Sequence, residues 1–262
     1  MTPTTRDALL GGRVWIEQPR RGFRAGSDAV LLAAACPARP GERVLDLGCG
    51  VGAAMLCVMA RVPGLHATGV ESDAGVAALA RLNAAPWGAR VVEADVAALP
   101  PDLRAETFDH VVLNPPYRLA GDGTCAADPA REAALREAAP GTLAAWCDVA
   151  CRRAGPRGTV TAIARADRLA DLLGALAPRL GGLVVLPVAG GPGLPAGRVV
   201  VQGAKGARAA LRLLAPLVTH RDGRATPILQ AILRDGAPID VNRDKLCETL
   251  PRRGGEMGGD SA

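Results

Sequence analysis

Residues 43–52 read Arg-Val-Leu-Asp-Leu-Gly-Cys-Gly-Val-Gly, and this stretch decides the fold. Its first half is a short apolar run that is typical of a buried strand, and its second half carries three glycines at alternate positions. Glycines at a strand end let the backbone turn sharply and let a ligand approach the start of the next helix, which we predict over residues 53–61. The stretch therefore indicates a strand, loop and helix that bind a nucleoside.

Strands and helices alternate outward from this unit. A helix over residues 27–36 precedes it, and further strands are predicted at 66–71, 90–94, 110–113 and 159–164, between helices at 73–84, 141–153 and 167–178. This alternation is typical of right-handed βαβ units around a parallel sheet. Residues 182–188 and 198–202 have only a Gly/Pro loop between them, so we expect an antiparallel hairpin. The pattern resembles a Rossmann-like class I methyltransferase: an α/β fold whose mostly parallel seven-stranded sheet ends in that hairpin, with helices on both faces.

The composition fits a single globular enzyme domain. Of the 262 residues, 49% are hydrophobic and 22% are charged, while aromatic residues make up only 2%. The net charge of +5 favours an acidic partner such as RNA. The seven cysteines form no CxxC pair and no cluster with metal-ligand spacing, so we expect no metal and a reducing cytoplasmic location. No segment has the length of a membrane span or the pattern of a signal peptide.

Polar residues at the predicted strand ends indicate the cofactor site. Asp46 stands two residues before Gly48, and Gly50 and Gly52 complete the loop. Glu71 ends the second strand of the unit, where an acidic side chain can accept hydrogen bonds from both ribose hydroxyls. Asp95 follows the third strand and is a candidate for the adenine amino group. The glycines alone also satisfy a relaxed NAD fingerprint, and each acid could instead be a helix cap or a solvated loop residue.

The fourth strand of the unit, residues 109–113, runs into Asn114-Pro115-Pro116-Tyr117. An exocyclic amine or an amide nitrogen is a poor nucleophile because its lone pair is delocalised. The Asn114 side-chain carbonyl and the Pro115 backbone carbonyl can accept its two N–H groups, and Pro115 and Pro116 hold that geometry rigidly. Tyr117 offers a flat face for stacking. We therefore predict a catalytic site for methylation of a conjugated nitrogen, with Asn114 also beside the cofactor.

Residues 22–28, Gly-Phe-Arg-Ala-Gly-Ser-Asp, precede the first predicted helix. Arg24, Gly26 and Asp28 are candidates to cover the methionine end of the cofactor. The alternative for Ser27 and Asp28 is a simple helix N-cap.

From Gln18-Pro19 through Gly22–Ala33, DLGCGVG, GVESD, NPPY and Val201–Gly206, the chain resembles the bacterial adenine-N6 methyltransferases that modify the anticodon loop of valine tRNA. The resemblance implies S-adenosylmethionine as cofactor, held by Asp46, Gly48, Gly50, Glu71 and Asp95, and a target amine held by residues 114–117. We predict three parts of the chain: residues 1–40 cover the cofactor site, 41–250 form the methyltransferase domain, and 251–262 form a flexible tail. We expect a monomer, with a homodimer left open.

Two other substrates remain open: a protein glutamine, as in N5-methylation of release factors, and a guanine N2 of rRNA. An inactive cofactor-binding module is a third alternative, which the intact NPPY sequence disfavours. If the substrate is tRNA, seven basic residues are candidate phosphate contacts, although for any single one a solvated surface charge is the more common interpretation: Arg20, Arg21, Arg24, Arg118, Lys205, Arg208 and Arg212.

Overall fold

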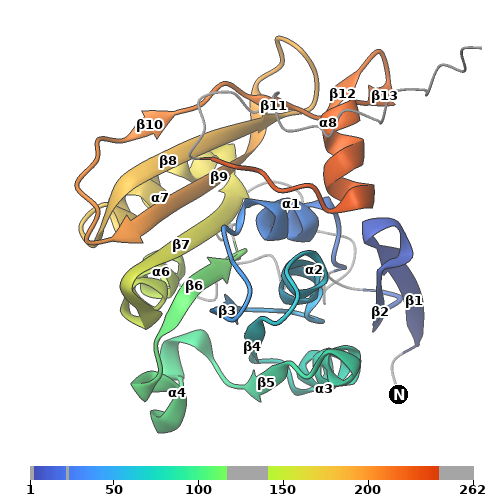
Figure 1. Cartoon of the computed structure of the whole chain (residues 1–262), viewed down its shortest axis with the longest axis vertical. Helices are drawn as coiled ribbons and strands as arrows, with labels where there is room; N and C mark the ends of the chain where they lie inside the picture. The colour runs from blue at the N-terminus through green and yellow to red at the C-terminus, as the bar shows by residue number, and fades with distance from the viewer. Residues whose placement is uncertain (1–2, 22–23, 117–140, 242–262) are drawn as a thin grey trace, which may run out of the picture.

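The computed structural model describes residues 3–21, 24–116 and 141–241 of the chain. A nine-stranded sheet crosses the molecule (Figure 1), and eight of its strands follow the order β10-β8-β9-β7-β6-β3-β4-β5, while β11 pairs separately with β8. The strand bounds are β3 Arg43–Leu47, β4 His66–Glu71, β5 Arg90–Glu93, β6 Phe108–Leu113, β7 Ala154–Arg165, β8 Leu180–Ala189, β9 Ala196–Lys205, β10 Arg212–Leu213 and β11 Leu217–Val218.

The sheet confirms the predicted fold class. Strands β5, β4, β3, β6 and β7 are parallel, and β9 lies antiparallel between β7 and β8. The predicted hairpin is therefore present as β8–β9. The sheet has two more strands than predicted, because the two-residue strands β10 and β11 pair parallel with the free edge of β8. Segments so short carry no periodic signal in the sequence.

Helices cover both faces of the sheet (Figure 1). One face carries α1 Ser27–Ala35, α2 Ala53–Arg61 and α3 Ala74–Ala84, and the other carries α4 Pro101–Ala105, α6 Thr142–Arg153 and α7 Leu169–Leu176. Alternate residues of one strand enter different cores: Val112 packs in the cluster that contains α1 and α2, and Val111 and Leu113 pack in the cluster that contains α6 and α7. This alternation is what a parallel strand buried on both faces requires.

The N-terminal segment is a hairpin of β1 Thr4–Leu9 and β2 Val14–Pro19, joined by the short helix η1 Leu10–Gly12. From the sequence alone, residues 13–18 read as a strand and residues 4–9 do not. We missed β1 because Thr-Thr-Arg-Asp-Ala-Leu is largely polar, and its alternate residues are exposed. Asn83 ties the hairpin to the body of the protein, because its amide binds the backbone N–H and C=O of Glu17 and the C=O of Val51 at 2.8–3.0 Å.

The C-terminal part of the described chain wraps back over α1. A second small hairpin, β12 His220–Arg221 and β13 Arg224–Ala225, is followed by α8 Pro227–Gln230 and the single helical turn η5 Ala231–Asp235. Ile239 then donates to the carbonyl of Ala34 at 2.8 Å. The tail expected at 251–262 lies outside the described residues, and none of the helices within them is long and apolar enough to cross a bilayer.

Candidate active site at the carboxyl ends of the parallel strands

The glycine loop and the Asn-Pro-Pro sequence leave the sheet side by side. Leu47, the last residue of β3, is the register partner of Leu113, the last residue of β6. Gly48 and Asn114 are the next residues of these adjacent strands. Ligands of open parallel sheets bind outside the carboxyl ends of the strands, so the two motifs face the same space. The residues that we predicted to bind cofactor and target amine are therefore brought together.

The loop after β3 depends on glycine for its backbone shape. Gly48, Gly50 and Gly52 have φ values of +68°, +55° and +87°, which L-amino acids with a side chain rarely adopt. A Cβ added at Gly48 would lie 2.6 Å from Cζ3 of Trp146 on α6, whereas a Cβ at Gly50 would meet nothing within 4 Å. The loop is therefore packed against the Trp146 ring at Gly48 and has open space beside Gly50. This open space would allow a ligand to approach the loop backbone closely.

Glu71 ends β4 beside this loop and holds it in place. Its Oε2 accepts the N–H of Gly50 at 3.0 Å, and its Oε1 accepts the N–H of Asp73 at 2.9 Å. An ionised carboxylate has about four acceptor positions, so two remain for ribose hydroxyls. Asp95 is exposed at the end of β5, where its Oδ1 accepts the N–H of Ala97 at 2.8 Å. Asp95 therefore caps a short turn, and its contact with adenine stays a prediction.

Asp46 acts beneath the loop. Its side chain is only 2% exposed, and Oδ2 accepts the N–H of Met55 in the first turn of α2 at 3.1 Å. Burial raises the pKa of Asp46 to about 7; the Met55 N–H lowers it, and the nearby Glu71 charge raises it. The side chain fixes the start of α2 relative to β3, so Asp46 stabilises the shape of the glycine loop between them.

The raised pKa of Asp46 predicts a pH-dependent stability. An aspartate in the unfolded chain has a pKa of about 3.9, so between about pH 4 and 7 the unfolded chain has released a proton that the folded protein keeps. The free energy of unfolding contributed by this group therefore falls as pH rises through that range. Asp46→Asn removes this titration. The unfolding free energy of the variant, relative to that of wild type, should therefore increase by about 2 kcal/mol as the pH rises from 5 to 8.

Urea unfolding of both proteins at several pH values, without ligand, measures this gain. A difference in unfolding free energy that stays constant from pH 5 to pH 8 would show that Asp46 is ionised in the folded protein throughout.

The residues predicted to cover the methionine end have partners within the protein. Arg24 donates to Thr5 and to the Pro19 carbonyl and pairs with Asp7 at 2.8 Å, which fixes the N-terminal hairpin to the segment before α1. Asp28 in the first turn of α1 pairs with Arg198 of β9 at 2.9 Å.

Gly26 is the N-cap residue of α1, and a Cβ there would meet nothing within 4 Å. Direct cofactor contacts from Arg24, Gly26 and Asp28 stay predictions.

Asn114 and Pro116 are half-buried and Pro115 is buried, directly after the last residue of β6. Tyr117 and Arg118 lie outside the described residues.

The structure adds two residues to the site that the sequence did not indicate. Trp146 packs its ring against Gly48, although it comes from a helix almost 100 residues further along the chain. Gly69 in the interior of β4 is required because a Cβ there would lie 2.7 Å from the Cys49 sulfur. A glycine inside a strand signals such a close approach, so Gly69 could have been found. Nothing local to Trp146 reveals its contact.

The predicted phosphate contacts near the C-terminus are not at this edge of the sheet. Lys205 pairs with Leu180 at the start of β8, and its Nζ donates to the carbonyls of Cys151 and Ala154 at 3.2 and 2.9 Å. It therefore caps the end of α6 at the opposite edge. Arg208 follows Lys205 there, and Arg212 on the outer strand β10 donates to the Val241 carbonyl. Lys205 and Arg208 thus lie at the opposite edge of the sheet from Asn114, so a phosphate contact from either residue would be far from the target base, and it stays a prediction.

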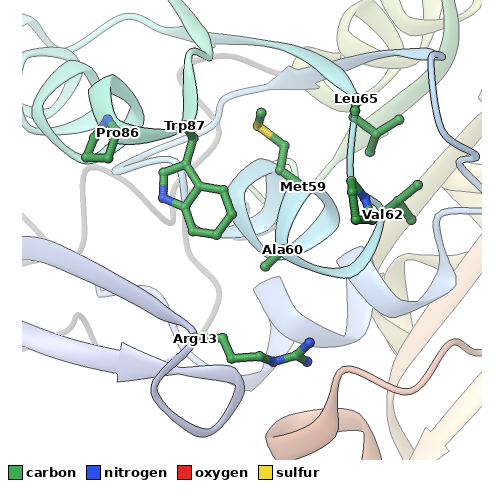
Figure 2. Close-up of a pocket in the computed structure, with 9 residues that line it drawn as sticks. Arg13, Met59, Ala60, Val62, Leu65, Pro86 and Trp87 are labelled. Carbon is green, nitrogen blue, oxygen red and sulfur yellow. The ribbon is translucent and has the colours of Figure 1, made fainter.

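A pocket of about 540 Å³ lies away from the motif residues (Figure 2). It lies beside the connection from α2 to β4, at the amino-end edge of the sheet. Met59 of α2, Trp87 and Arg13, which stands just before β2, are among its lining residues. None of the predicted site residues lines it. Within residues 3–21, 24–116 and 141–241, no group of three or more His, Cys, Asp or Glu side chains could hold a metal ion.

The strand order, with one antiparallel strand between the last two parallel ones, is that of the class I methyltransferases. Solved structures agree. A protein from Agrobacterium tumefaciens described as a predicted O-methyltransferase is 30% identical, with a TM-score of 0.66 over 80% of this chain and 97% of that one. A 16S rRNA N2 methyltransferase from Thermus thermophilus shares the fold at 20% identity, with a TM-score of 0.53 over 78% of this chain and 50% of that one.

The family model for the methyltransferase small domain matches residues 23–140. A tRNA1(Val) (adenine(37)-N6)-methyltransferase from Dickeya chrysanthemi is 30% identical over 233 residues, which are 84% of this chain and 90% of that protein. The protein of the same name from Aeromonas hydrophila is 35% identical, and the match spans 56% of this chain and 62% of that relative's length. The chain belongs to the tRNA1(Val) (adenine(37)-N6)-methyltransferase family.

Proposed function

We propose that this protein transfers a methyl group from S-adenosylmethionine to the exocyclic N6 of an adenine in the anticodon loop of a tRNA. The single observation that carries the proposal is the register pairing of Leu47 with Leu113, which sets the glycine loop beside Asn114. The glycine loop that would bind the cofactor and the two carbonyl groups that would bind the amine then lie at adjacent strand ends. The family membership of the chain supports adenine as the target.

The cofactor fits the residues that are present. The open space around Gly50 admits a close approach of the ligand to the backbone, and Glu71 keeps acceptor capacity for two ribose hydroxyls. Asp95 is exposed at the neighbouring strand end and is our candidate for the adenine amino group of the cofactor. When bound, S-adenosylmethionine supplies a methyl group attached to a positively charged sulfur.

The target amine is held by carbonyl oxygens. Asn114 Oδ1 and the Pro115 carbonyl each accept one N–H of the amine, which favours a pyramidal nitrogen whose lone pair points away from the ring. Because the ring of Pro115 fixes its φ and the neighbouring strand fixes Asn114, little reorganisation is needed as positive charge grows on the nitrogen. Tyr117 is our candidate for stacking against the base.

The substrate class follows from the relatives. Those of Dickeya and Aeromonas bear names that specify adenine 37 of a valine tRNA. A base in a single-stranded loop is the cheapest to draw out of its stack into a site of this kind. We expect the protein to work as a monomer in the cytoplasm.

Transfer of labelled methyl from S-adenosylmethionine to total tRNA, rRNA and ribosomal proteins of a deletion strain tests the function. We expect label only in tRNA and, after digestion, only in N6-methyladenosine. Label confined to protein would favour the glutamine reaction, and label in N2-methylguanosine would favour the rRNA reaction; either result would overturn the proposal.

A further inference from the structure

The β12–β13 hairpin is a rigid projection at the active edge of the sheet. Asp222 and Gly223 form its two-residue turn with φ values of +51° and +70°, as a type I′ turn requires. The hairpin is fixed at its base, where Thr226 N–H donates to the Thr219 carbonyl at 2.9 Å and Thr219 N–H donates to the Ala189 carbonyl at 2.9 Å. Its position is therefore set by the end of β8.

Two arginines stand directly opposite each other on this hairpin. Arg221 is the register partner of Arg224, so both side chains leave the same face, with Cβ atoms about 5 Å apart. Like charges in this arrangement destabilise a strand pair. Both residues are exposed, and neither side chain makes an ion pair or hydrogen bond with another described residue. Asp222 in the turn is the one acidic side chain of the hairpin, and His220 hydrogen-bonds Thr219 at 3.0 Å.

Other arginines that follow β7 or begin β9 at this edge already have carboxylate partners. Arg198 pairs with Asp28 at 2.9 Å, Arg168 pairs with Asp171 at 2.9 Å, and Arg165 pairs with Asp167. Arg221 and Arg224 differ from them because no described acidic side chain pairs with either one. A bound anion would relieve their mutual repulsion.

The hairpin lies within reach of the site. β11 extends the carboxyl end of β8, since Leu217 and Val218 pair with Val188 and Ala189. Strands β7, β9 and β8 separate β11 from β6, and four spacings of about 4.8 Å give roughly 19 Å between β11 and β6. That corresponds to five or six stacked nucleotide steps at about 3.4 Å each. Figure 1 shows β12 and β13 beside β11 and the β8–β9 connection.

We propose that Arg221 and Arg224 form a clamp for one backbone phosphate of the RNA substrate, several nucleotides from the methylated base. Two guanidinium groups that leave one face of a rigid hairpin can bind a phosphate together, each through charge-assisted hydrogen bonds. The clamp rests on the proposed function, and it adds the surface that holds the RNA at a distance from Asn114.

The test is the double variant R221Q/R224Q, assayed for methylation of tRNA at several salt concentrations. We expect the KM for tRNA to rise roughly tenfold with kcat and the Kd for S-adenosylmethionine unchanged, and the slope of log affinity against log salt to fall by about 1. The R221K/R224K variant keeps both charges and should recover most of the affinity. Arg104→Gln, which changes an exposed arginine on α4 near the amino end of β6, is the control and should leave KM unchanged.

Because the double variant removes a repulsion between exposed groups, its melting temperature should not fall. A tRNA KM and a salt slope equal to those of wild type would overturn the clamp while leaving the methyltransferase function intact. If the wild-type protein methylates no RNA under any condition, the proposed function itself fails, and the clamp fails with it. Equal losses of kcat and of cofactor affinity would also overturn it, since they would indicate a structural role.

Discussion

Asn114→Ala should lower the rate of methyl transfer by roughly 100- to 1,000-fold, the loss typical when one preorganised hydrogen-bonding group of an active site is removed. In the proposed mechanism the side-chain carbonyl is one of the two acceptors that hold the target amine, and alanine offers none. Affinity for S-adenosylmethionine should stay close to that of wild type, because the proposed cofactor contacts come from the glycine loop and Glu71, at the ends of the neighbouring strands β3 and β4. Single-turnover transfer and calorimetry measure the two quantities separately.

Asn114→Asp is the matched variant for this prediction. It keeps an acceptor oxygen at the same position, so it should lose less of the rate than Asn114→Ala. An alanine variant that transfers methyl at the wild-type rate would contradict the role of Asn114. A variant that loses rate and cofactor affinity in equal measure would show that Asn114 supports the cofactor instead.

Gly48→Ala should destabilise the protein and abolish most of its cofactor affinity. The left-handed φ of +68° costs an alanine about 1–2 kcal/mol, and overlap with the Trp146 ring adds about 1–3 kcal/mol. Gly41→Ala is the control, because Gly41 has a φ of +84° with no atom near the added Cβ. The loss of stability in Gly41→Ala measures the cost of the left-handed backbone alone, so the additional loss in Gly48→Ala measures the overlap with the Trp146 ring.

The two costs at Gly48 can be separated further with Trp146. Trp146→Ala removes the overlap but not the strained φ, so Gly48→Ala should cost less stability in the Trp146→Ala background than in the wild-type background. Urea unfolding of the single and double variants gives the coupling between the two positions. A Gly48→Ala protein as stable as Gly41→Ala would show that the ring moves aside without cost.

Much of this site could be predicted because its signals are local in the sequence. Glycines with positive φ, an acid at a strand end and the Asn-Pro-Pro turn each follow a strand directly, and parallel strands bring their carboxyl ends together. Helices α1, α2, α3 and α6 begin within one residue of their predicted starts, as the strong periodic pattern allows.

The rest depends on contacts between distant segments. Trp146 reaches Gly48, and Asn83 reaches both β2 and the glycine loop, yet neither residue stands in a motif. The pairing of Arg221 with Arg224 depends on a two-residue turn that the sequence alone did not separate from an ordinary loop. Lys205 is a further example. It lies in the Val201–Gly206 segment that carries the family resemblance, yet only the fold shows that its Nζ caps the end of α6.

The most direct test of the central claim compares two valine tRNA transcripts, one with adenine at position 37 and one with guanine there, each incubated with the protein and labelled S-adenosylmethionine. The proposed function predicts that label enters the adenine transcript alone and is recovered as N6-methyladenosine. Equal labelling of both transcripts, or no label in either under conditions in which the protein binds the cofactor, would contradict it.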